Sequence, residues 1–130
     1  MNSRLTPPSQ RRPYIHLVLA VVAAYVVNAL AIAGTEQLLV GMSSGTRFYV
    51  ADVATQCVIQ IGCGYLCSRI SKTTTAIVAL IVVGLLIGSF SLVTSWRTEP
   101  HWYAIALITL YTPSVWIGHR IATGAAKLSI

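Results

Sequence analysis

The sequence predicts an all-α integral membrane protein, a small bundle of four antiparallel transmembrane helices with both termini on one side. Two observations carry this fold class. The 130-residue chain is 55% hydrophobic and only 9% charged, whereas about 25% of residues are charged in an ordinary soluble domain. Four apolar stretches also have the roughly 20-residue length that crosses about 30 Å of hydrocarbon. They comprise residues 14–33, 47–68, 75–94 and 102–121.

The distribution of Lys and Arg predicts the orientation, because cytoplasmic loops of membrane proteins carry an excess of these residues. Seven lie on the side of the N-terminus: Arg4, Arg11, Arg12, Arg69, Lys72, Arg120 and Lys127. Only Arg47 and Arg97 lie on the opposite side, beside Glu36 and Glu99. Aromatic residues also fall near both expected boundaries of the membrane. We therefore expect a multi-pass protein of a bacterial inner membrane with both termini in the cytoplasm.

Residues 1–13 carry three prolines and three arginines, which predicts a disordered basic tail on the cytoplasmic side. The first apolar stretch, 14–33, ends in Ala31-Ile32-Ala33 before Gly34, a pattern that also resembles a signal-peptide cleavage site. Its apolar run of about 20 residues exceeds the roughly 7–15 of a typical signal core. We expect a retained helix, and cleavage remains the alternative.

The connections between the apolar stretches are short. The first outer loop, 34–46, contains apolar residues that either prolong the preceding helix or lie along the membrane surface. The loops at 69–74 and 95–100 are tight enough to make the helices that they join antiparallel neighbours. The transmembrane domain is expected to cover 14–122, and 123–130 to form a short cytoplasmic tail.

A row of polar residues on the second stretch is the strongest functional signal. Asp52, Gln56, Gln60, Cys63 and Cys67 are spaced 4, 4, 3 and 4 residues apart. This spacing places them on one face of a helix. An ionised side chain at the centre of a bilayer costs about 2.5–3.5 kcal/mol, so this face must contact protein or water.

Comparison of depths along the helices indicates which groups can meet this face. Asn28 on the first helix and Thr109 on the fourth are expected at a depth similar to that of Asp52. The candidate polar site within the membrane therefore comprises Asp52, Gln56, Gln60, Asn28 and Thr109. One interpretation is a site for a solute, an ion or a proton. The other is a set of interhelical hydrogen bonds that only stabilises the bundle, at about 0.6 kcal/mol each.

The third stretch contains a G-x-x-x-G motif formed by Gly84 and Gly88, and Ser91 continues the same small-residue face. Small side chains allow the backbones of two membrane helices to approach closely. The motif predicts a helix-packing surface, either within the chain or between two copies of it.

Catalytic, metal and nucleic-acid functions are not expected. Cys63, Cys67, His16 and His119 lie near the inner boundary and form the only candidate metal set, but cysteines also serve as small packing residues. We expect no metal and no other cofactor. The chain shows no Ser-His-Asp set, paired carboxylates or glycine-rich phosphate loop, so we expect no enzyme activity. The basic residues form no stripe on one folded face, which argues against nucleic acid.

The segment Gly64-Tyr65-Leu66-Cys67-Ser68-Arg69-Ile70 resembles a pattern in uncharacterised small four-helix bacterial membrane proteins. The resemblance covers 48–72 and implies no activity. In size and helix number the chain is also similar to small multidrug resistance transporters. Those proteins carry a membrane-embedded Glu in their first helix, whereas this chain has only Asn28 there. The comparison therefore gives little support to proton-coupled drug export.

From these features we expect a small integral membrane protein that acts as a non-catalytic packing or accessory component. The alternative is a small transporter or a permeation unit for an ion or a proton, with a polar site around Asp52. The lipid bilayer is the expected partner, and another membrane protein or a second copy of the chain remains open.

Overall fold

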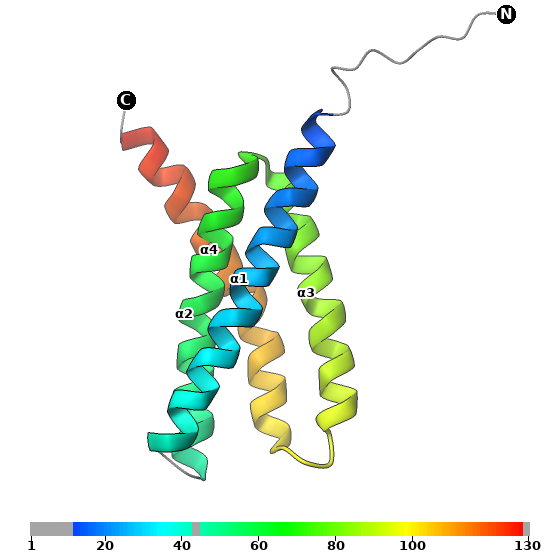
Figure 1. The fold of residues 1–130 in the computed structure, drawn as a ribbon, viewed down its shortest axis with the longest axis vertical. Helices are drawn as coiled ribbons and strands as arrows, with labels where there is room; N and C mark the ends of the chain where they lie inside the picture. The colour runs from blue at the N-terminus through cyan, green and yellow to red at the C-terminus, as the bar shows by residue number, and fades with distance from the viewer. Residues whose placement is uncertain (1–11, 43–44, 129–130) are drawn as a thin grey trace, which may run out of the picture.

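The computed structural model describes residues 12–42 and 45–128, and these residues form four α-helices without a strand (Figure 1). The helices are α1 (Arg12–Met42), α2 (Thr46–Ser71), α3 (Thr74–Ser95) and α4 (His101–Leu128). Figure 1 shows the start of α1, the α2–α3 connection and the end of α4 at one end of the molecule, which we call the terminal end. The α3–α4 connection lies at the opposite end, which we call the distal end.

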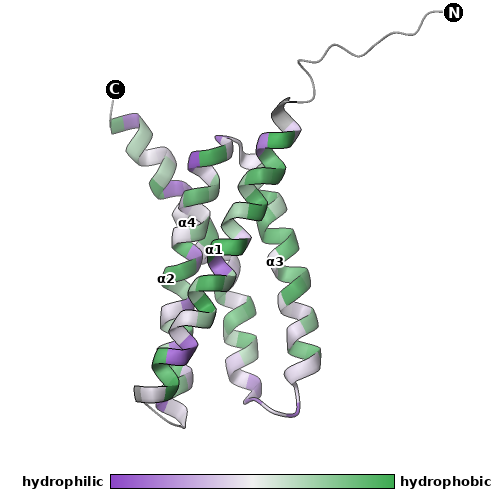
Figure 2. Cartoon of the chain, in the orientation of Figure 1, coloured by the Kyte–Doolittle hydropathy of each residue, from purple (hydrophilic) through white to green (hydrophobic). Residues whose placement is uncertain are grey.

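Three of the helices are long and apolar enough to cross a membrane. The corresponding segments are Tyr14–Gly41, Thr46–Ser71 and Thr74–Ser95. Figure 2 shows hydrophobic residues along most of α1 and α3. Large apolar side chains point outward, and Leu30, Phe90 and Val93 are 70%, 72% and 75% exposed. An outer surface of this kind is suited to lipid rather than water, which supports a membrane protein.

That α4 also crosses the membrane stays a prediction. α4 has the length of a membrane span but is not among the three segments identified as apolar enough. Its hydropathy is lowered by polar residues along its length: Thr109, Thr112, Ser114, His119 and Arg120.

All four helices exceed the expected spans, and α1 and α4 extend the furthest beyond them. α1 continues to Met42, through most of the segment expected to be an outer loop. Residues 36–39 favour the helical conformation, and the Thr35 hydroxyl donates to the carbonyls of Ala31 and Ile32 at 2.9 and 3.0 Å. α4 likewise continues through the expected C-terminal tail to Leu128. Of the expected N-terminal tail, residues 1–11 lie outside the described part of the chain, and Arg12 already belongs to α1.

The α2–α3 connection is very short because Lys72 adopts the left-handed conformation, with φ of 55°. Its N–H donates to the carbonyl of Ser68 at 3.0 Å and ends α2. Thr73 is extended, and α3 begins at Thr74. At the other connection, the backbone N–H of Glu99 donates to the carbonyl of Ser95 at 3.1 Å. This bond holds the residue before Pro100 close to the end of α3.

The backbones of α2 and α4 touch where Gly64 crosses Gly118. A Cβ atom added at Gly64 would lie 2.2 Å from the carbonyl oxygen of Val115, and one at Gly118 would lie 2.0 Å from that of Ile61. α2 packs most extensively against α4 and then against α1. The close crossing lies within a buried cluster of mainly small residues: Ala20, Ala24, Cys63, Cys67, Ala76, Ile77, Leu80 and Val115.

The G-x-x-x-G motif contacts α4 within the same chain. A Cβ atom at Gly84 would lie 2.0 Å from the Tyr111 hydroxyl oxygen, whereas one at Gly88 would meet nothing nearer than Ile108 Cγ1 at 3.6 Å. The Tyr111 hydroxyl donates to the carbonyl of Leu80 at 2.8 Å. Gly84 therefore makes room for the ring of Tyr111 to reach the backbone of α3.

We expect Gly64→Ala to destabilise the bundle by about 1–3 kcal/mol, because the added methyl group overlaps the backbone of α4. Gly62→Ala is the matched control, since nothing lies within 4 Å of its Cβ position. It should change stability by less than about 1 kcal/mol. Thermal unfolding of both variants in detergent measures the difference, and equal melting temperatures would contradict the close crossing.

The two glycines of the motif should likewise behave differently. Gly84→Ala should lower the melting temperature, because Tyr111 must leave its position and lose its bond to Leu80, at a cost of about 1–3 kcal/mol. Gly88→Ala should be tolerated, since its added methyl group makes only an ordinary contact. A larger effect at Gly88 would point to a contact outside the single chain.

Candidate functional site

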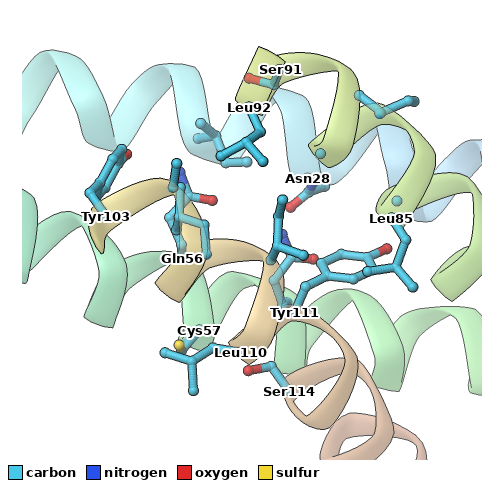
Figure 3. A pocket seen from close by; sticks show the side chains of 18 of the residues that line it. Asn28, Gln56, Cys57, Leu85, Ser91, Leu92, Tyr103, Leu110, Tyr111 and Ser114 are labelled. Atoms are coloured by element: carbon cyan, nitrogen blue, oxygen red, sulfur yellow. The ribbon is translucent and has the colours of Figure 1, made fainter. Parts of the chain in front are cut away.

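A cavity of about 280 Å³ lies between the helices and is lined by residues from all four (Figure 3). Its polar lining consists of Tyr25, Asn28, Glu36, Gln56, Cys57, Gln60, Ser91, Glu99, Tyr103, Tyr111 and Ser114. The remaining lining residues are Gly84, Gly88, Ala104 and leucines and isoleucines. The lining includes two carboxylates and no Lys or Arg. The cavity therefore combines a small apolar space with oxygen-rich polar walls.

The polar face of α2 points into the bundle. Asp52 is fully buried, and Gln56 and Gln60 are 9% and 8% exposed. Both glutamines line the cavity, whereas Asp52 lies outside its lining. Cys57, which the spacing places off this face, is half-buried and also borders the cavity.

Asp52 is held by Tyr103 of α4, whose hydroxyl donates to its Oδ2 atom. The other carboxylate oxygen, Oδ1, is buried without a hydrogen-bond partner. Tyr103 is itself fixed by the ring of Tyr49, with 4.9 Å between ring centroids, and Trp102 contacts Tyr49 at 6.3 Å. An aromatic cluster thus positions the one donor to this buried carboxylate among residues 12–42 and 45–128. Tyr103 lines the cavity, whereas Asp52 does not.

Asn28 of α1 is the second incompletely paired group. Its side chain is 9% exposed and lines the cavity, and its Oδ1 atom is buried without a hydrogen-bond partner. Figure 3 shows Asn28, Gln56, Tyr103 and Tyr111 around the cavity. A buried acceptor that lacks a donor costs about 1–3 kcal/mol. A ligand that carries donors can recover this free energy.

All acidic residues of the chain gather at or beside this cavity. The sequence contains three: Glu36, Asp52 and Glu99. Glu36 and Glu99 are part of the lining, and Tyr103, the partner of Asp52, is another part. The two arginines nearby in the sequence, Arg47 and Arg97, do not line the cavity. The electrostatic potential here therefore favours a positive charge.

The structure brings Asn28, Gln56 and Gln60 to one cavity and places Asp52 beside it, but it separates Thr109 from them. Thr109 is exposed, and its hydroxyl donates to the carbonyl of Ile105 in its own helix at 2.8 Å. A threonine in a helix commonly satisfies its hydroxyl in this way. Thr109 therefore lies outside the lining of the cavity. Gly84, Gly88 and Ser91 form part of the α3 wall of the cavity.

The four residues of the candidate metal set do not converge. The Cys63 thiol donates to the carbonyl of Ala24 at 3.4 Å, and Cys67 is fully buried beside it in the core. The Nδ1 atom of His119 lies 2.8 Å from Ser68 Oγ, while His16 is exposed. Among residues 12–42 and 45–128, no three His, Cys, Asp or Glu side chains are grouped so that they could hold a metal ion.

Sequence reasoning did not identify Tyr103, Glu36, Glu99 or Tyr111 as site residues. Tyr103 is only the third residue of α4, and the tertiary structure brings its hydroxyl to Asp52 of α2. Glu36 was placed in a loop, and only the extension of α1 brings it to the cavity. Comparisons with known protein families, curated proteins and solved structures found no match for this chain. The functional argument therefore rests on the site itself.

We expect Tyr103→Phe to destabilise the protein by about 1–3 kcal/mol, because the buried Asp52 then loses its donor. Tyr49→Phe removes the hydroxyl from the neighbouring ring, which does not bond to Asp52, and should have a smaller effect. Thermal unfolding in detergent gives both values. In the background of Asp52→Asn, the cost of Tyr103→Phe should shrink, and an unchanged cost would exclude coupling between the two side chains.

Proposed function

We propose that this chain is a small transport or permeation unit of a bacterial inner membrane that binds a small cationic solute in the cavity between its helices. In this proposal all four helices cross the bilayer in an antiparallel arrangement, and both termini are cytoplasmic. α4 has 28 residues, or about 42 Å at 1.5 Å per residue, which exceeds the roughly 30 Å required. The excess of Lys and Arg at the terminal end supports the orientation.

The observation that carries the proposal is Asn28 Oδ1, a buried acceptor on the cavity lining that has no hydrogen-bond donor. Because it is an oxygen atom, its missing partner is a hydrogen-bond donor. The carboxylates of Glu36 and Glu99 on the lining, without Lys or Arg, favour a donor that is also positively charged. Ammonium, amidinium and guanidinium groups have both properties.

The shape and the rings of the cavity support the same solute class. A volume of about 280 Å³ lies at the small end of the roughly 300–1,000 Å³ typical of ligand sites. Three tyrosines, Tyr25, Tyr103 and Tyr111, contribute rings to the lining. Aromatic faces attract cations by about 0.5–2 kcal/mol, more strongly where water is excluded.

Access is proposed from the distal side, because Glu36 lies near the end of α1 and Glu99 lies in the α3–α4 connection. Toward the terminal end, the Gly64–Gly118 crossing and the small-residue core close the path. Passage then requires α4 to move relative to α2. Pro113, one residue before the lining residue Ser114, removes a backbone donor from α4. Figure 1 shows that the second half of α4 is inclined to its first half, and we assign the hinge to this position.

The proposal is tested by the uptake of labelled methylammonium and guanidinium into liposomes that contain the purified protein. The wild-type protein should take up both cations above protein-free liposomes, and Asn28→Leu should reduce the rate about tenfold or more. Loss of one hydrogen bond to a charged group, worth about 1.5–3 kcal/mol, accounts for this factor. Glu36→Gln combined with Glu99→Gln should also reduce uptake.

Thr109→Val is the matched control, because this exposed residue lies outside the cavity and its hydroxyl bonds only within α4. Its uptake should equal that of the wild type. Asp52→Asn provides a further comparison: if it folds with normal stability and loses uptake, a purely structural role of Asp52 is excluded. Absence of uptake by a folded wild-type protein would refute transport of these cations.

A non-catalytic accessory component, without an activity of its own, is the second candidate. It is favoured by α3, which packs less extensively against the rest of the bundle than any other described helix and which exposes large apolar side chains such as Phe90 and Val93. Such a component would be stabilised by a second membrane protein or a second copy. In that case the variants of Asn28 and Asp52 should change stability only, and crosslinks from α3 to another chain should form in membranes. Neither candidate includes an enzymatic step or a cofactor.

A further inference from the structure

A second cavity, of about 560 Å³, lies at the terminal end between the end of α2, the start of α3 and the second half of α4. Its polar lining consists of Ser68, Arg69, Lys72, Thr74, His119 and Thr123. The remaining lining residues are alanines, so no carboxylate faces it. The three acidic residues of the chain lie at or beside the other cavity. The two cavities therefore have opposite electrostatic character.

The local backbone places the two cations together at this site. Arg69 lies in the last turn of α2, and Lys72 follows as its left-handed cap. Both side chains are exposed, and the guanidinium of Arg69 lies over the ring of Tyr65 at 6.0 Å. α3 begins directly afterwards at Thr74, and its N-cap residue, Thr73, makes no side-chain capping bond. The first N–H groups of α3 add a partial positive charge on the same side.

His119 contributes a donor from α4. Its Nδ1 atom lies 2.8 Å from the hydroxyl oxygen of Ser68, which is 7% exposed. When the hydroxyl donates to Nδ1, the proton of the neutral imidazole lies on Nε2, which can then donate to a ligand. The bond between Ser68 and His119 also ties α4 to α2 on one wall of the cavity. Two cations, the imidazole of His119 and the hydroxyl group of Thr74 form a set of donors suited to phosphate oxygens.

The position of the cavity along the membrane-spanning segments indicates which kind of phosphate group it would meet. Ser71 and Thr74 are the ends of two of the segments that can cross a membrane. The cavity thus lies at the level where hydrocarbon gives way to lipid headgroups. Ile70 and Ile121, which neighbour the lining residues in the sequence, are 38% and 50% exposed and provide apolar surface for acyl chains. Basic pockets between membrane helices commonly bind anionic headgroups.

We propose that this basic cavity binds the phosphate group of an anionic phospholipid. Arg69 and Lys72 supply the charge, His119 and the hydroxyl groups of Thr74 and Ser68 line the headgroup site, and the acyl chains remain in the bilayer. The site is distinct from the cation cavity and does not depend on transport. Its occupant bridges α2, α3 and α4 at the end where the second half of α4 diverges from the bundle (Figure 1).

The test uses the full-length protein in a mild neutral detergent, with lipid binding measured by native mass spectrometry and by the melting temperature. Phosphatidylglycerol should bind at one equivalent, about tenfold or more tightly than phosphatidylcholine, and should raise the melting temperature. Combining Arg69→Gln with Lys72→Asn should weaken this binding about tenfold or more, because each cation near a membrane surface contributes about fivefold. Asn is chosen at position 72 because it tolerates the left-handed conformation.

The matched control combines Arg120→Gln with Lys127→Gln, which removes the same charge from α4 at the same end but outside the cavity lining. It should keep phosphatidylglycerol affinity within about twofold of the wild type. If both double variants lose affinity equally, binding is only general attraction to basic residues and the proposal fails. Equal affinity for the two lipids also overturns it.

Measurements with soluble phosphates distinguish a lipid phosphate from a phosphate in solution. Inorganic phosphate and glycerol phosphate should not raise the melting temperature at concentrations at which phosphatidylglycerol does. If they do so as effectively, the ligand is a soluble phosphate and the lipid assignment is wrong. Should the Arg69 and Lys72 double variant fail to fold, Lys72→Asn alone serves, with an expected loss of about fivefold, and unchanged affinity then refutes the site.

Discussion

The polar face of α2 cannot face lipid, and this constraint determines where the other helices lie. Asp52, Gln56 and Gln60 are all at least nine-tenths buried, so the remaining helices must cover them. α4 supplies the hydroxyl of Tyr103 for Asp52, and the aromatic cluster around Tyr49 holds that hydroxyl in place. In a medium without water, a buried carboxylate retains its position only if protein groups solvate it. The pairing of α2 with α4 is therefore both the largest helix contact and the electrostatic centre of the fold.

The terminal and distal halves of the bundle pack in different ways. In the terminal half, small residues and the Gly64–Gly118 crossing bring backbones into contact, and the buried core contains alanine and cysteine as well as larger side chains. In the distal half, larger polar side chains keep the helices apart, and the cavity forms there. Tyr111 joins the halves, because its ring reaches α3 over Gly84 while it also lines the cavity. The cavity of the proposed cation site thus lies in the distal half, and the close backbone crossing lies in the terminal half.

The two ends of the bundle also differ in the charge of the residues that line their cavities. The acidic residues gather at or beside the distal cavity, and the cavity at the terminal end is lined by Arg69, Lys72 and His119. This separation agrees with the proposed orientation, in which the basic end faces the cytoplasm. The two linings therefore differ in charge, and this difference is the basis for proposing a cationic solute at one end and a phosphate group at the other. The Ser68–His119 bond shows how the basic end is organised by contacts between helices rather than by charge alone.

Local patterns in the sequence determined the helical class, the membrane character of three helices and the inward face of α2. These features depend on hydropathy and on the period of the helix, which neighbouring residues define by themselves. The tertiary structure alone decided the partner of Asp52, the gathering of Glu36 and Glu99 at one cavity and the contact of Gly84 with Tyr111. Depth along a helix can be counted from the sequence, but the rotation of one helix about its axis relative to another cannot. That rotation places Tyr103 rather than Thr109 beside the polar face, and it follows from backbone contacts between residues more than 50 positions apart, such as Gly64 and Val115.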